Sequence, residues 1–250
     1  MLWSGRLCGA KDVHDPDDRP RAPRDAKVQN ALRRGLALPR WMGLAVRIGL
    51  ADDPPDAWAG DRVAMAPRRR QTFLWGRHCA RAALDAAGFA GTAPLPVGGD
   101  RQPVWPHGWR GSISHSDHAA LAIAAPVAAC AEIGVDLEPL MPAEGAREIA
   151  ALVAKAPECA LLADHPPGQA VPLILSAKEA LFKALYPHAG RFMDFPSAAL
   201  VRRRGGILLL RLTVDWNDRR RAGTVVRVCT TILEGHAVAA CWRPAAHRPR

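Results

Sequence analysis

Paired cysteines, long apolar runs and a secretory leader are all missing from this sequence of 250 residues. The six cysteines are scattered and none belongs to a C-x-x-C pair, which argues against a zinc site or a redox motif. Several lie in apolar runs, as expected of buried thiols in a reducing compartment. No apolar run approaches the length of a membrane span, and the N-terminus lacks the apolar segment of a signal peptide. We therefore expect a cytoplasmic protein without a membrane span.

The charge balance is strongly basic. Lys and Arg number 34 against 24 Asp and Glu, which gives a formal net charge of +10. A surplus of this size favours an anionic partner, such as a nucleic acid, a phosphorylated ligand or an acidic protein. Hydrophobic residues make up 49% of the chain, which is enough for most of it to fold as one large or two small domains.

Residues 1–39 are rich in Asp, Arg and Pro and lack apolar periodicity, so they are interpreted as a disordered tail. Alternatively, the natural start is Met42, close to the first segment that looks folded. Beyond the tail, strands and helices fall into two halves, 40–130 and 131–250, and predict an α+β fold with two similar halves. Strands are expected at 44–50, 111–116, 119–124, 133–139, 207–214, 225–231 and 237–242. Helices are expected at 67–88, at 146–162 with a break near Pro157, and from 175 to a stop at Pro187.

The helix that begins near Leu175 carries a carboxylate in an unusual place. At helical period, Glu179 falls within an apolar stripe formed by Leu175, Phe182 and Tyr186. Burying an ionised carboxylate is costly unless a cation meets it. Lys183, four residues further along the helix, or a metal ion could supply that positive charge. The alternative is a solvated Glu–Lys pair on the helix surface.

The strand at 133–139 places two more carboxylates side by side. Asp136 and Glu138 share one face with Gly134, while the apolar residues occupy the other face. Neighbouring carboxylates repel each other unless a cation bridges them, and oxygen ligands of this kind suit Mg²⁺. The alternative is the solvated face of an amphipathic strand.

Basic and hydroxyl side chains suggest phosphate contacts. Arg70, Arg77 and Arg81 share one side of their helix, although a solvated basic face is equally compatible with the spacing. Ser114 and His115 are adjacent on a strand and point to opposite faces, and no G-x-S-x-G motif surrounds them. Contacts to phosphate are therefore favoured over a hydrolase pair.

Three motifs occur in a fixed order: S-I-S-H-S at 112–116, G-V-D-L-E at 134–138 and S-A-K-E-A-L-F-K at 176–183. This combination resembles the 4′-phosphopantetheinyl transferase superfamily. The longer stretch W-P-H-G-W-R-G-S-I-S-H-S is most similar to the enterobactin synthetase component D branch. The resemblance extends from about Trp41 to Trp242.

The resemblance implies a fold and a reaction. It implies a pseudo-twofold pair of α+β halves in one monomeric chain, with coenzyme A in the cleft between them. Phosphopantetheine would pass from coenzyme A to a serine of an acidic acyl or peptidyl carrier protein, with release of adenosine 3′,5′-bisphosphate. The transfer would require a bound Mg²⁺ ion, or Mn²⁺ in its place. Carrier proteins of siderophore, nonribosomal peptide and polyketide synthesis would be the class of partner.

The resemblance also implies roles for particular residues. The metal ligands would be Asp136, Glu138 and Glu179. Catalysis would involve Lys183 at the transferred phosphate, Glu158 as a further acid, and either Glu179 or a water on the metal as the base. Coenzyme A would contact Arg70, Arg77, Arg81, Arg101, Ser114, His115 and Lys178. One departure is Leu175, where members often carry an aromatic residue.

Two other readings remain to be weighed. A basic nucleic-acid-binding module would explain the arginine runs, but it does not explain three acids placed to share a metal, and no nucleic-acid motif is visible. A catalytically idle relative that acts as a carrier-binding scaffold is opposed by the presence of all three metal acids. We therefore expect a transferase with no nucleic-acid partner.

Overall fold

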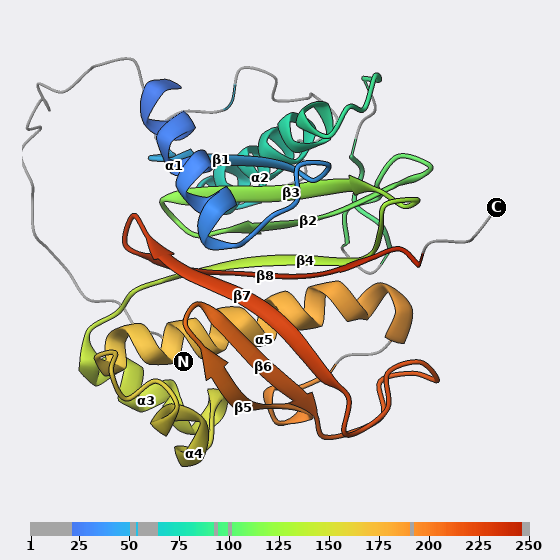
Figure 1. The fold of residues 1–250 in the computed structure, drawn as a ribbon. Coiled ribbons are helices and arrows are strands. Elements are labelled where there is room, and N and C mark those ends of the chain that lie inside the picture. Colours follow the sequence, from blue (N-terminus) through green and yellow to red (C-terminus); the bar gives the residue numbers. More distant parts are fainter. Residues whose placement is uncertain are drawn as a thin grey trace, which may run out of the picture.

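A computed structural model of the protein describes residues 22–50, 54, 65–92, 95–99, 102–190 and 193–246. Two antiparallel sheets divide it into halves, as predicted: a three-stranded sheet of order β1-β3-β2 and a five-stranded sheet of order β4-β8-β7-β6-β5. Figure 1 shows the three-stranded sheet in the upper part with α2 above it and α1 crossing in front of it, and the five-stranded sheet in the lower part with α3, α4 and α5.

The elements follow the chain without exchange between the halves. The N-terminal half contains α1 (Ala22–Gly35), β1 (Gly43–Ile48), α2 (Pro67–Ala86), β2 (Trp109–His115) and β3 (Ala119–Pro126). The C-terminal half contains β4 (Cys130–Pro139), α3 (Ala143–Val153), α4 (Ala156–Ala160), α5 (Pro167–Ala189), the 3-10 helix η2 (Phe195–Ser197), β5 (Ala198–Arg204), β6 (Ile207–Leu212), β7 (Val225–Leu233) and β8 (His236–Pro244). The division of the chain between residues 130 and 131 stays a prediction.

Each half packs one long helix on one face of its sheet. Helix α2 lies on the three-stranded sheet over alanines of β3, and α5 lies on the five-stranded sheet. The opposite faces of the two sheets bury a third core together with α1. Because β3 is covered on both faces, its odd and even positions are both apolar.

A glycine lets the helix approach closely in each half. A Cβ on Gly134 of β4 would lie 2.1 Å from the carbonyl oxygen of Ala180 in α5. In the same way, a Cβ on Gly43 of β1 would lie 1.7 Å from the carbonyl oxygen of Ala83 in α2. The space beside Gly134 is therefore filled by α5, which brings Glu179 and Lys183 of that helix next to Asp136 and Glu138 of β4.

The two sheets meet along their edge strands β2 and β4, joined by two serine hydroxyls. Ser112 Oγ accepts the backbone N–H of Val135 at 3.0 Å, and Ser114 Oγ accepts that of Leu137 at 3.3 Å. Since the residue numbers of the serines and of their N–H donors rise together, the two strands run in the same direction. Side-chain hydroxyls thus replace a backbone ladder where the halves join, and we call this contact the serine seam.

The predicted disordered tail is wrong for residues 22–38. They form α1 and a following turn, and the apolar side chains of Val28, Leu32, Leu36 and Leu38 are buried in the shared core. Gln29 Nε2 also donates to the carbonyl of Leu44 in β1 at 2.6 Å. Residues 1–21 lie outside the described chain.

Helix α5 is longer than predicted at both ends. It begins at Pro167, and the carbonyl of Gly168, which Pro172 cannot bond, accepts the N–H of Met141 at 3.2 Å. It continues through Pro187 and ends at Gly190, which adopts the left-handed conformation with φ 65°. The predicted helix at 146–162 is two helices, because the chain is extended at Ala154 and Pro157 falls in the first turn of α4. No helix among the described residues is both long and apolar enough to cross a membrane.

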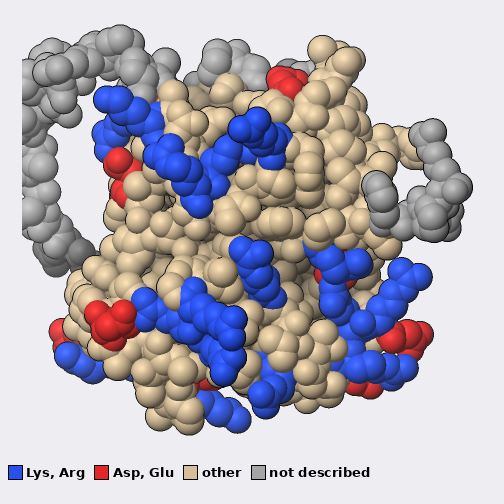
Figure 2. Space-filling model, viewed as in Figure 1, with Lys and Arg blue, Asp and Glu red and all other residues tan. Residues whose placement is uncertain are grey.

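The basic charge is spread over the surface. Figure 2 shows Lys and Arg predominating over Asp and Glu on the lower half of the face in view. Exposed arginines on β5, β6 and β7 include Arg202, Arg204, Arg211 and Arg227. Of the three arginine runs in the sequence, only the one at 202–204 lies on the C-terminal sheet, where Arg202 and Arg204 are exposed.

Candidate functional site

An ion pair between β4 and α5 forms the centre of the site. Lys183 Nζ donates to Asp136 Oδ1 at 2.6 Å and to Ser114 Oγ at 3.1 Å. Ser114 Oγ in turn donates to Asp136 Oδ1 at 2.8 Å. The structure thus brings together three of the residues selected from the sequence. Lys183, placed four residues after Glu179, has Asp136 as its ion-pair partner.

The negative charges of the two glutamates beside this ion pair are less well compensated. Glu138 and Glu179 are half-buried, and neither makes a hydrogen bond or ion pair with another described residue. Burial, followed by repulsion from Asp136 and Glu179, raises the pKa of Glu138 to about 7, although Lys183 acts in the opposite direction. Burial and Asp136 likewise raise the pKa of Glu179. One lysine therefore leaves the three carboxylates with uncompensated negative charge.

The donor set suits a divalent cation, although it is not assembled around one. No three His, Cys, Asp or Glu side chains in the described ranges stand as a ready-made metal cluster. However, Asp136 Oδ2 is buried and makes no hydrogen bond, and the mutual repulsion of the acids is what a cation relieves. Carboxylate oxygens are also the ligands that Mg²⁺ prefers. The residues fit such an ion in charge and chemistry.

Two cavities flank the acidic centre. One, of about 600 Å³, lies between the halves beside Lys183, and we call it the apolar cavity because Trp105, Ile113, Ile133 and Phe182 line it. The other, of about 510 Å³, lies at the start of α2 next to Glu138, and we call it the α2 cavity. The centre therefore lies between an apolar space and one lined by charged side chains of both signs, in which Arg68 pairs with Asp117 at 2.6 Å.

The α2 cavity contains residues that the sequence reasoning did not select. Arg68, Arg69 and Thr72 line it together with His115 and Ser116. The available signal was the run of three arginines from residue 68, of which only Arg70 was chosen. The first turn of a helix presents free backbone N–H groups, so this end of α2 favours an anion.

The other predicted arginines lie elsewhere. Arg77 is only 3% exposed and its guanidinium stacks 4.8 Å from the ring centre of Phe73. Arg70 and Arg81 are half-buried and line neither of the two cavities. Arg101 lies outside the described residues.

Glu158 and Lys178 are not part of this centre, and their assignment to catalysis and cofactor binding is corrected. Lys178 Nζ pairs with Glu158 Oε1 at 2.8 Å and also donates to the carbonyl of Val153. Glu158 further accepts the backbone N–H groups of Lys155 and Leu200, each at 2.8 Å. The two side chains are 4% and 6% exposed, so they form a fully bonded structural pair that joins α4, α5 and β5.

Comparison with known proteins gives a consistent family. The model of the 4′-phosphopantetheinyl transferase N-terminal domain matches residues 62–125, and that of the 4′-phosphopantetheinyl transferase superfamily matches residues 132–241. These two segments coincide with α2 to β3 and with β4 to β8. The chain belongs to the 4′-phosphopantetheinyl transferase superfamily.

Its relatives include the predicted branch. The chain is 37% identical over 155 residues to 4′-phosphopantetheinyl transferase Svp of Streptomyces mobaraensis, which covers 60% of this chain and 63% of the relative. It is 33% identical over 138 residues to 4′-phosphopantetheinyl transferase PptT of Mycobacterium tuberculosis, covering 52% and 57%. It is 38% identical over 128 residues to enterobactin synthase component D of Salmonella typhi, covering 50% and 52%. The chain thus spans less than two thirds of the length of these relatives.

Proposed function

We propose that this chain transfers 4′-phosphopantetheine from coenzyme A to a serine of an acyl or peptidyl carrier protein in a Mg²⁺-dependent reaction. The observation that carries the proposal is the acidic centre with Lys183, set between the α2 cavity and the apolar cavity. Coenzyme A has the same order of parts: a phosphorylated nucleoside, a pyrophosphate and a long pantetheine chain.

The two cavities divide the donor between them. Arg68 and Arg69, with the first turn of α2, would hold the nucleotide phosphates, because arginine forks and free backbone N–H groups both bind phosphate oxygens. The apolar cavity would take the pantetheine chain. This arrangement leaves the pyrophosphate beside Lys183.

The acidic centre would perform the chemistry. Asp136, Glu138 and Glu179 would hold Mg²⁺, which supplies neutralisation of the pyrophosphate charge. Lys183 would stabilise the negative charge that develops on the leaving adenosine 3′,5′-bisphosphate while the phosphoryl group passes to the serine. Either Glu179 or a water on the metal would accept the proton of the carrier serine.

The experiment incubates the chain and coenzyme A with apo acyl, peptidyl and aryl carrier proteins and follows intact mass. We expect at least one carrier to gain one phosphopantetheine, and chelation of Mg²⁺ to prevent the gain. The absence of a mass shift on every carrier would contradict the proposal, and binding of a carrier without a shift would favour the idle scaffold instead.

A variant tests the centre directly. We expect Asp136→Ala to lower the turnover number by about 10²–10³-fold, since it removes a preorganised charged group next to the reacting phosphate. The thermal unfolding midpoint should change little. Asp85→Ala, which removes an exposed acid at the end of α2, is the matched control. Wild-type turnover of Asp136→Ala would remove Asp136 from the site.

A further inference from the structure

A third cavity, of about 270 Å³, lies next to the apolar cavity and is strongly basic. It is lined by Glu132, His188, Asn217, Asp218, Arg219, Arg220 and Arg243. His188 lines both this space, which we call the arginine cavity, and the apolar cavity. His188 therefore lies at the boundary between the two cavities, and we call this boundary the His188 wall.

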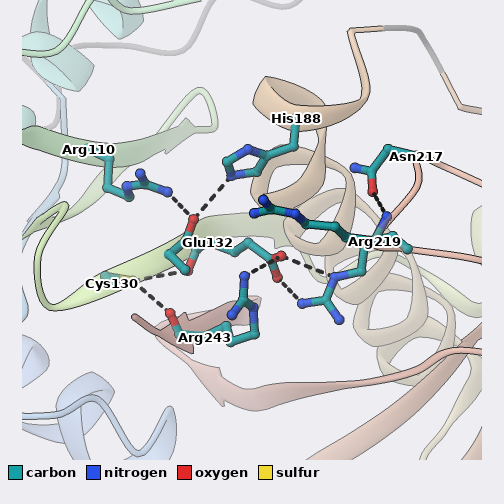
Figure 3. Close-up of polar contacts among 9 residues, drawn as sticks. Arg110, Cys130, Glu132, His188, Asn217, Arg219 and Arg243 are labelled. Atoms are coloured by element: carbon teal, nitrogen blue, oxygen red, sulfur yellow. Dashed lines mark hydrogen bonds and ion pairs between the residues drawn. The ribbon is translucent and has the colours of Figure 1, made fainter. Parts of the chain in front are cut away.

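Two of the three arginines are fixed by one buried carboxylate (Figure 3). Glu132 Oε1 accepts Arg220 Nε and Arg243 Nη2, each at 3.1 Å, and Glu132 Oε2 accepts Arg220 Nη2. The side chain of Glu132 is 7% exposed and that of Arg220 is 16% exposed. A single carboxylate cannot neutralise two guanidinium groups, so this cluster keeps a net positive charge.

Arg219 adds a further positive charge at the rim. Its side chain is exposed and makes no hydrogen bond or ion pair with another described side chain, while its backbone N–H donates to Asn217 Oδ1 at 2.9 Å. Figure 3 shows its guanidinium directed toward the space between His188 and Glu132. The carboxylate of Asp218, by contrast, pairs with Arg221 and is 97% exposed. The cavity therefore presents guanidinium groups to a ligand.

The wall between the cavities is held from both halves of the protein. His188 Nε2 lies 3.1 Å from the carbonyl oxygen of Ala131, to which Arg110 Nη1 also donates (Figure 3). Because a carbonyl only accepts, His188 Nε2 carries a hydrogen in this contact. Arg110 from β2 and His188 from α5 thus meet on β4 at the end of the apolar cavity.

The arginine cavity lies at the right distance from the reacting phosphate. Strands β2 and β4 run in the same direction, from Arg110 and Glu132 to Ser114 and Asp136. Four residues of strand cover about 13 Å, which is within the reach of an extended pantetheine chain. If the phosphate lies at Lys183, the sulfur of the donor reaches the His188 wall.

We propose that the arginine cavity binds the terminal carboxylate of a dicarboxylic acyl group on the sulfur of coenzyme A. This inference rests on the proposed function and names its donor class: acyl-coenzyme A with a free carboxylate, of the succinyl type. In the transfer, the serine Oγ–P bond forms and the bridging P–O bond of the pyrophosphate breaks. The serine proton passes to the base, adenosine 3′,5′-bisphosphate leaves, and the thioester is unchanged. The carrier gains an acyl-phosphopantetheine with a free carboxylate.

The experiment compares donors on one apo carrier by intact mass. The donors are plain, succinyl- and butyryl-coenzyme A, of which the last two have similar length and differ in charge. A carboxylate that meets a guanidinium makes a charge-assisted hydrogen bond, so we expect kcat/KM for the succinyl donor to exceed that for the butyryl donor by about tenfold. Arg219→Ala should bring the ratio close to one and leave kcat/KM for plain coenzyme A unchanged. Arg211→Ala, an exposed arginine on β6, should keep the wild-type ratio.

The possible outcomes separate the two proposals. Transfer from plain coenzyme A with no succinyl preference, or a preference that Arg219→Ala leaves intact, overturns the donor assignment alone. An equal loss with all three donors in Arg219→Ala overturns it as well and assigns Arg219 to the carrier protein. No transfer from any donor overturns the proposed function itself.

Discussion

Two Lys–carboxylate pairs of α5 differ in how completely they are bonded. Both carboxylate oxygens of Glu158 are bonded. Oε1 accepts from Lys178 and from the backbone N–H of Leu200, and Oε2 accepts from the backbone N–H of Lys155. Asp136 has Lys183 and Ser114 on Oδ1 and no partner on the buried Oδ2. A fully bonded buried carboxylate stabilises a fold, whereas one with an open acceptor can take a ligand. This difference is why we keep Asp136 in the site and remove Glu158.

Glu132 predicts how stability depends on pH. Burial acts to raise the pKa of Glu132, but the hydrogen bonds and charges of Arg220 and Arg243 outweigh it and hold the pKa below the ordinary value. The network therefore contributes fully above the unfolded pKa of about 4.3, and its contribution is lost as pH falls through the lowered folded value. We expect Glu132→Gln to cost about 2 kcal/mol at pH 7 and to flatten the acid limb of the stability curve.

Urea unfolding at several pH values would measure both effects. Glu148→Gln, at an exposed position of α3, is the control and should stay within about 0.5 kcal/mol of the wild type. An acid limb as steep in Glu132→Gln as in the wild type would show that other carboxylates set the acid stability.

At the level of elements, the contact between β4 and α5 places the site. Gly134 allows the close approach, and the strand alternation puts Asp136 and Glu138 on the same face as this glycine. We expect Gly134→Ala to push α5 away, to destabilise the protein by about 3 kcal/mol, and to lower activity along with stability. Chemical unfolding and carrier mass would be measured together.

A second glycine in a helix provides the control. A Cβ on Gly145 of α3 meets no atom within 4 Å, so Gly145→Ala should raise stability by about 0.5–1 kcal/mol through its better helix propensity. Equal stability changes for the two variants would show that close packing at Gly134 is unimportant.

The same elements mark how far the sequence could be read. Strand alternation predicted the opposite faces of β4, and helical period predicted the half-buried face of Glu179, because both patterns are local. The length of α5 was not predictable, since the carbonyl that Pro172 leaves free is bonded by the distant Met141. The pairing of Lys178 with Glu158 was equally invisible, because burial of both side chains depends on how α4 packs on α5.

At the level of the whole molecule, α1 closes the core that the halves share. Two of the four buried apolar residues lie in α1 and two in the turn that follows it; they were missed because residues 1–39 as a whole are rich in Asp, Arg and Pro, the composition of a tail. Arg24 also pairs with Glu234 in the turn between β7 and β8, so the helix contacts both halves. The predicted family and two-halved fold did not depend on this segment and are confirmed by the family models.

A pair of truncations tests this role. A chain that begins at residue 22 keeps α1, whereas one that begins at residue 40 lacks it and exposes the shared core. We expect the shorter chain to lose on the order of 5 kcal/mol, measured by thermal and chemical unfolding. Equal stability of the two truncated chains would show that α1 covers the core without stabilising it.

The pairing of β4 with β8 has a consequence for synthesis of the protein. Asp136 on β4 pairs with Ala239 on β8, which follows every other strand of the described chain. On a ribosome, β4 emerges early but remains an unpaired edge until the last strand has been translated. The acids of the centre are then positioned only after β8 has been translated. A nascent chain is therefore expected to bind no donor until β8 has left the exit tunnel.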